Sequence, residues 1–131
     1  MATARAISVL SLSQNRAVVR SIHVHIESHG YGIGGILESD PFSVYDLGIA
    51  LRVLEPRPRA IVVGRGYTEE EANEVRTAFA EYHRDVDLDA GVVIKITDEV
   101  FDEVGKEGIP KWVLEQLQAY FEKWQALRVL L

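Results

Sequence analysis

The stretch AIVVGRGYTEEEA (60–72) joins a continuously apolar run to two glycines and to an acidic segment headed by a threonine. The run AIVVG (60–64) is rich in β-branched residues and is typical of a strand buried on both faces of a parallel sheet. Thr68 and Glu71 have the spacing of a helix capping box, and the glutamates after Thr68 place negative charge in the first helical turn. A buried strand that leads directly into a helix predicts an α/β fold.

The segments on either side of this stretch alternate between strand and helix patterns. In chain order we expect a strand over 18–27, a glycine-rich loop over 28–41, a helix over 42–54, a strand over 60–64, a helix over 68–83, a strand over 91–96, a short helix over 98–104 and a last helix from Pro110. Asp40 would cap the helix over 42–54, with Pro41 in its first turn. Residues 5–12 fit either a helix or a fourth strand at an edge of the sheet.

Strands that alternate with helices predict right-handed crossovers and a parallel sheet with helices on its faces. We therefore expect residues 1–131 to form one α/β domain, a small three-layer sandwich with a mainly parallel sheet of three to four strands. The strand–Gly-x-Gly–helix unit over 60–80, with GVVIKI and the helix after it, resembles small single-domain Rossmann-like proteins, many of them uncharacterised. The resemblance covers about residues 20–125 and implies a fold without an activity.

Gly64 and Gly66 stand where a dinucleotide-binding fingerprint has its first two glycines. The third glycine of that motif would fall at Glu69, and an acidic first turn repels a phosphate. A tight, well-capped strand-to-helix turn explains the same residues, and they do not identify a cofactor. For a small polar or anionic ligand at the carboxyl ends of the strands, the expected contacts are Tyr31, Gly64, Arg65, Gly66, Tyr67 and Thr68.

The run SIHVHIESHGYGIGG (21–35) places His23, His25, Glu27 and His29 on alternate residues. On a strand these side chains would share a face, and two imidazoles with a carboxylate can bind one metal ion. The alternative is the polar face of a half-covered strand. A third interpretation assigns only His29, at the end of the strand, to a site, where it would act as a catalytic acid or base.

The composition argues against several classes of function. The 131 residues carry a formal net charge of −6, which disfavours nonspecific binding to nucleic acid or to an anionic membrane surface. The chain contains no cysteine, so it has neither a disulfide framework nor a thiol nucleophile. No apolar run in the sequence approaches the length of a membrane span.

The two ends of the sequence each leave two interpretations open. Residues 1–20 are serine-rich and arginine-containing and have no acidic residue, which is typical of an organelle transit peptide; the alternative is an ordinary first element of a cytoplasmic domain. The last helix carries a wide apolar face that includes Trp124 and Leu127. This face fits either the core of the domain or the contact of a homodimer.

Three functions follow from these patterns. The first is binding of a small polar or anionic, nucleotide-like molecule at the carboxyl ends of the strands. The second is a metal-dependent enzyme that uses His23, His25 and His29. The third is a non-catalytic domain that associates with itself through the last helix. The sequence does not decide whether the chain is an enzyme.

Overall fold

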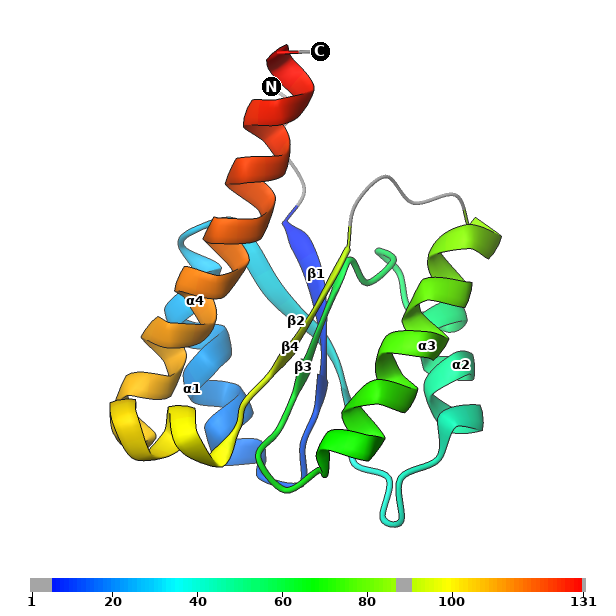
Figure 1. Ribbon diagram of the computed structural model, residues 1–131, viewed down its shortest axis with the longest axis vertical. Coiled ribbons are helices and arrows are strands. Elements are labelled where there is room, and N and C mark those ends of the chain that lie inside the picture. The colour runs from blue at the N-terminus through cyan, green and yellow to red at the C-terminus, as the bar shows by residue number, and fades with distance from the viewer. Residues whose placement is uncertain (1–5, 87–90, 131) are drawn as a thin grey trace.

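The computed structural model describes residues 6–86 and 91–130, with side chains up to residue 124. Strands and helices alternate, and each strand is followed by one helix (Figure 1). In chain order the elements are β1 (Ile7–Leu12), α1 (Arg16–Glu27), β2 (Tyr31–Leu37), α2 (Val44–Val53), β3 (Ala60–Val63), α3 (Glu69–Val86), β4 (Val92–Lys95) and α4 (Asp98–Leu130).

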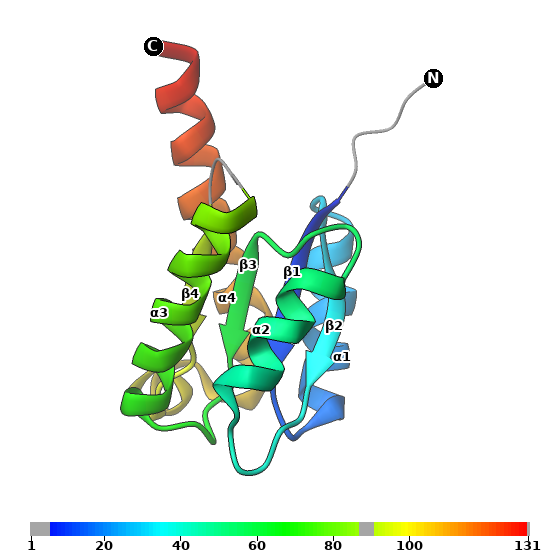
Figure 2. The same ribbon diagram turned by 90° about the vertical axis from the view of Figure 1, so that its right-hand side faces the viewer.

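The four strands form one parallel sheet in the order β2-β1-β3-β4. Helices α1 and α4 cover one face, and α2 and α3 cover the other, so the sheet is the middle of three layers (Figures 1 and 2). The predicted α/β sandwich, with a parallel sheet and helices on both faces, is thereby confirmed.

Strand β3 shows why the apolar run 60–64 decides the architecture. All four of its residues are buried, because their side chains alternate between two hydrophobic cores. Ala60 and Val62 pack beneath α1 and α4, whereas Ile61 and Val63 pack beneath α2 and α3. A strand covered on both faces has no need for a polar side, which is the reason for its continuous apolar sequence.

The predicted strand over 18–27 is wrong, since these residues belong to helix α1. Asn15 caps this helix by accepting from the backbone N–H groups of Ala17 and Val18. Its apolar residues fit two periods: Ile22, Val24 and Ile26 alternate as on a strand, but Val19, Ile22 and Ile26 also lie on one side of a helix. The exposure of Val24, 66%, shows that the helical period determines the packing.

The predicted glycine-rich loop over 28–41 is also wrong, because Tyr31–Leu37 forms the edge strand β2. Val9 pairs with Ile33 and Leu10 pairs with Gly35, so Gly34 is an extra residue in β2. Such a bulge shifts the alternation of side chains. Ile33 therefore packs in the core beneath α1 and α4, whereas Leu37 packs in the core beneath α2 and α3.

Residues 7–12 form β1 in the middle of the sheet, where the sequence predicted a helix or an edge strand. Cleavage after residue 20 would therefore remove a central strand and the start of α1. In the described part of the chain, no helix is long and apolar enough to cross a membrane.

The remaining boundaries differ from the predictions in detail. Ser43 caps α2 by accepting from Asp46 N–H, in place of the predicted Asp40 cap. The short helix over 98–104 and the last helix meet at Gly105, where φ is 73°, and Pro110 lies inside α4 rather than at a helix start. The apolar side of this last helix packs in the core through Val113, Leu114, Leu117 and Phe121.

Candidate functional site

The strand order creates a natural crevice between β1 and β3. The helix that follows β1 lies on one face of the sheet, and the helix that follows β3 lies on the other (Figure 1). In open parallel α/β sheets, ligands bind outside the carboxyl ends of the two strands where the connections diverge in this way. In this chain those ends lead into the loops at 13–15 and 64–66.

A cavity of about 420 Å³ lies at this position, on the side of α1 and α4. The apolar residues that line it are mostly buried, whereas the polar residues that line it are mostly exposed, apart from the buried Ser11. The apolar lining comes from Val18, Val19, Ile22, Val62, Ile96, Phe101 and Ile109. The polar lining comes from Ser11, Ser13, Gln14, Asn15, Arg65 and Lys106, with Gly64 and Gly66 beside them. A concave apolar site with a few polar groups is the usual form of a small-molecule site.

Arg65 is the best-placed cation at this cavity. Its guanidinium carbon lies 3.8 Å from the centroid of the Phe101 ring, and its Nε lies 3.8 Å from Asp98 Oδ1. The aromatic ring and the carboxylate both belong to the first turns of α4, so the side chain bridges the β3–α3 turn to that helix. Nearly half of the Arg65 side chain stays exposed and available to a ligand.

The turn at Gly64 is held in place from two sides. Gly64 N–H donates to Leu12 O at 2.8 Å, which ties the turn to the end of β1. Lys95 Nζ donates to Gly64 O at 3.0 Å and to Ile96 O at 2.7 Å, which ties the turn to the end of β4. Burial lowers the pKa of Lys95. Because these contacts join three strand ends, Lys95 has a positioning role that the apolar run GVVIKI did not reveal.

Tyr67 and Thr68, which follow Gly66, make their contacts away from the cavity. Thr68 and Glu71 form the predicted capping box: Thr68 N–H donates to Glu71 Oε1 at 2.8 Å, and Glu71 N–H donates to Thr68 Oγ1 at 3.0 Å. Tyr67 is buried on the opposite face, beneath α2 and α3, with its ring edge-on to Phe42. Burial, then the nearby Glu71, raises the pKa of Tyr67. Of the expected ligand contacts after β3, Gly64, Arg65 and Gly66 therefore line the cavity.

His29 and Tyr31 lie at the opposite end of the sheet, because the chain enters β2 at Tyr31 rather than leaving a strand there. His29 is exposed, with Nδ1 3.2 Å from Ser28 Oγ. Tyr31 is buried against Phe121, and burial raises its pKa. The prediction that His29 and Tyr31 lie with Arg65 at the carboxyl ends of the strands is therefore wrong.

His23 and His25 point to different surroundings on α1. His23 Nδ1 accepts from Ile33 N–H at 3.0 Å, so the ring satisfies a backbone donor on the outer edge of β2. His23 Nε2 lies 3.6 Å from Glu27 Oε2. His25 is exposed and stacks with His29 at a centroid distance of 6.2 Å. Within residues 6–86 and 91–130, no three His, Cys, Asp or Glu side chains gather into a set that could hold a metal ion.

The sequence patterns missed two contributors to the cavity. The loop of Ser13, Gln14 and Asn15 was hidden because β1 and α1 were not distinguished; the one usable signal was Asn15 before an apolar helical period. Lys106 reaches the cavity because α4 bends at Gly105. No local sequence pattern predicts that Lys106 lies close to the other residues of the cavity.

No protein-family model matches this chain, and comparisons with the curated proteins and with the solved structures likewise gave no match.

Proposed function

We infer that the chain binds a small anionic molecule in the cavity between the β1–α1 loop and the β3–α3 turn. The observation that carries this proposal is the apolar cavity of about 420 Å³ at the β1/β3 divergence with Arg65 fixed at its mouth. Lys106 adds a second cation, in a chain whose formal net charge is −6. Two cations gathered at one cavity of an acidic protein favour a negatively charged ligand.

The chemistry of the lining narrows the ligand class. The apolar interior suits a planar or aliphatic body, and the guanidinium suits a carboxylate or phosphate that it can bind through two hydrogen bonds. The N-terminus of α1 contributes less, because Asn15 already occupies the N–H groups of Ala17 and Val18. Recognition of the anion therefore rests on side-chain cations, and a nucleoside monophosphate or an aromatic carboxylate satisfies both requirements.

The proposal is tested by calorimetric titration of the purified chain with adenosine monophosphate, benzoate and inorganic phosphate. We expect adenosine monophosphate or benzoate to bind more tightly than inorganic phosphate, because only the first two fill the apolar interior. Arg65→Ala should weaken binding about tenfold or more, as loss of a charge-assisted contact costs roughly 1.5–3 kcal/mol.

The matched control is Arg84→Ala, which removes an exposed arginine from the last turn of α3. Its affinity should equal that of the unchanged chain. No binding of any of the three probes, or equal affinity in the Arg65→Ala and Arg84→Ala variants, would contradict the proposed site.

A further inference from the structure

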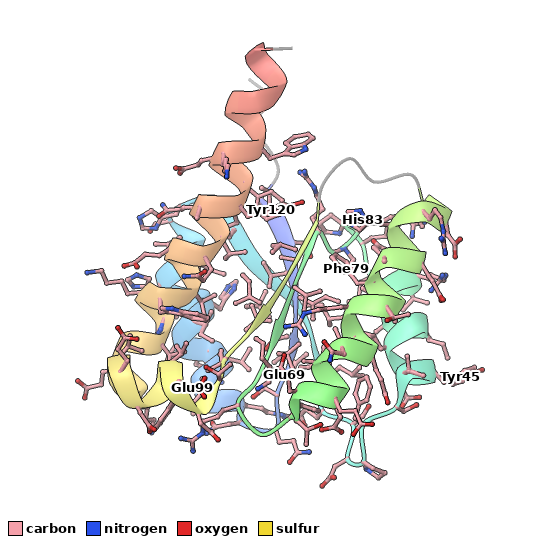
Figure 3. The ribbon with its side chains drawn as sticks, in the orientation of Figure 1. Tyr45, Glu69, Phe79, His83, Glu99 and Tyr120 are labelled. Carbon is pink, nitrogen blue, oxygen red and sulfur yellow. The ribbon has the colours of Figure 1, made fainter. Side chains whose placement is uncertain are left out.

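Helix α2 carries an apolar stripe on the side that faces away from the sheet. Its inner side is filled by Leu47 and Leu51, which are fully buried. Its outer side exposes four of the six large apolar side chains that are exposed in the described part of the chain: Val44 (49%), Tyr45 (75%), Ile49 (46%) and Val53 (67%). Figure 3 shows Tyr45 projecting from α2 away from the body of the protein. Apolar side chains concentrated in this way mark a contact surface.

Gly48 and Arg52 complete this surface, which is a shallow groove of about 380 Å³. We refer to its six residues, Val44, Tyr45, Gly48, Ile49, Arg52 and Val53, as the α2 stripe. Arg52 is held in a defined orientation, since Nη1 donates to Gly48 O at 3.1 Å and Nη2 to Asp85 Oδ2 at 2.6 Å. Gly48 has no side chain and leaves a notch between Tyr45 and Arg52.

The α2 stripe is complementary to itself when one copy is reversed. In an antiparallel pair of helices related by a two-fold axis between positions 48 and 49, each residue meets the one equally far from the midpoint. Val44 then meets Val53 of the second copy. Tyr45 meets Arg52, a ring against a guanidinium, and Ile49 meets the Gly48 notch. All six residues find a fitting counterpart in this arrangement.

The charges on α2 favour the same antiparallel orientation. Asp46 lies in the first turn of the helix and Arg52 lies in the last turn. Reversal of the second copy brings its Arg52 to the level of Tyr45, one helical rise of about 1.5 Å from Asp46. The two helix dipoles then oppose each other, and the Asp46 carboxylate lies at nearly the same level along the helices as the partner's Arg52, which keeps its ion pair with Asp85. A parallel pair would instead place Arg52 against Arg52.

We propose that the α2 stripe is the contact surface of a two-fold symmetric homodimer of this chain. The helix is about 15 Å long, so the contact is at the small end of specific interfaces and the dimer is weak, with a population that rises with concentration. The stripe lies on the face opposite the cavity with Arg65, and the proposal does not rest on ligand binding.

Sedimentation velocity of the full chain over a concentration series tests the proposal. The unchanged chain should pass from monomer to dimer as concentration rises. Ile49→Asp should raise the dimer dissociation constant at least tenfold, because it places a carboxylate against the partner helix. Val24→Asp is the matched control: it removes a comparably exposed apolar side chain from α1 and should leave the constant unchanged.

A second variant distinguishes this specific contact from nonspecific hydrophobic association. Gly48→Leu enlarges the apolar surface but fills the notch that receives Ile49, and Arg52 Nη1 is the nearest side-chain atom to the new Cβ at 3.6 Å. The proposal expects weaker association of Gly48→Leu, whereas nonspecific association would become stronger. A chain that stays monomeric throughout the series, or a Gly48→Leu variant that associates more tightly, would overturn it.

Cross-linking determines the orientation, and the absence of native cysteines makes it selective. A mixture of the Val44→Cys and Val53→Cys variants should form a mixed disulfide dimer under mild oxidation, in excess over either self-linked dimer. Predominant self-linking of each variant would indicate a parallel contact and would overturn the proposed arrangement.

Discussion

The two glycine-rich stretches of this chain are alike in sequence and opposite in structure. Residues 31–35 belong to the edge strand β2, whereas Gly64 and Gly66 flank the exposed Arg65 in a turn beside the candidate site. A Cβ on Gly34 would lie 2.4 Å from Ser8 Oγ, and one on Gly35 would lie 2.8 Å from Leu54 Cδ1.

A Cβ on Gly66, by contrast, would meet nothing within 4 Å. Glycine is thus needed at positions 34 and 35 because neighbouring side chains occupy the space. In the turn, a Cβ on Gly64 would lie 3.0 Å from Leu12 O, so this glycine is also packed, and open space is found only at Gly66. The spacing of glycines along the chain does not distinguish the two cases. Only the contacts of each position tell a packed glycine from one that faces open space.

The largest effect is expected from Gly34→Ala, which should destabilise the fold by roughly 1–3 kcal/mol because the methyl group overlaps the buried Ser8 hydroxyl. Chemical denaturation gives the unfolding free energy. The double variant Ser8→Ala/Gly34→Ala should recover most of the loss, since it removes the hydroxyl oxygen from the overlap. Gly35→Ala is the comparison variant: it meets the flexible end of Leu54 and should cost less. Equal losses for Gly34→Ala and the double variant would show that overlap with Ser8 is not the cause.

A smaller effect is expected from His23→Leu, about 1 kcal/mol, because Ile33 N–H loses its acceptor on the outer edge of β2. The same substitution at His25, which is exposed on the same helix, is the control and should be near neutral. Hydrogen exchange of the Ile33 amide would report the loss directly. Unchanged protection of this amide in His23→Leu would mean that the imidazole does not hold the edge of the strand.

The contribution of Lys95 to the free energy of unfolding depends on pH. Burial lowers the pKa of Lys95 in the folded chain below its ordinary value of 10.5, which applies to the unfolded chain. At a pH between the lowered pKa and 10.5, the unfolded chain therefore binds more protons than the folded chain. Stability from this group therefore rises with pH over that window. The difference in unfolding free energy between the unchanged chain and Lys95→Met should grow in favour of the unchanged chain as pH approaches about 10.5. A difference that shrinks over the same range would contradict the lowered pKa.

The smallest effect on stability is expected from Gly66→Ala, within about 0.5 kcal/mol, because the added methyl group enters open space. The same methyl group projects beside the proposed cavity, so the affinity for adenosine monophosphate or benzoate should change even though the fold does not. A variant that loses stability as much as Gly34→Ala would place Gly66 among the packed glycines.

The sequence by itself determined the features that depend on neighbours along the chain. The buried run AIVVG, the capping box of Thr68 and Glu71 and the alternation that makes an α/β fold all follow from local pattern and were confirmed. Arg65 was singled out because a residue between two glycines at the end of a buried strand lies at the carboxyl edge of the sheet, whatever the order of the strands.

Only the tertiary structure decided which of two valid periods Val19–Ile26 would adopt, because the choice depends on the α4 side chains against which those residues pack. It also decided that glycines of β2 pack against Ser8 and Leu54, which are distant in sequence. The candidate cavity has the same origin. Its walls come from α1, the β3–α3 turn and α4, and no local pattern brings three such segments together.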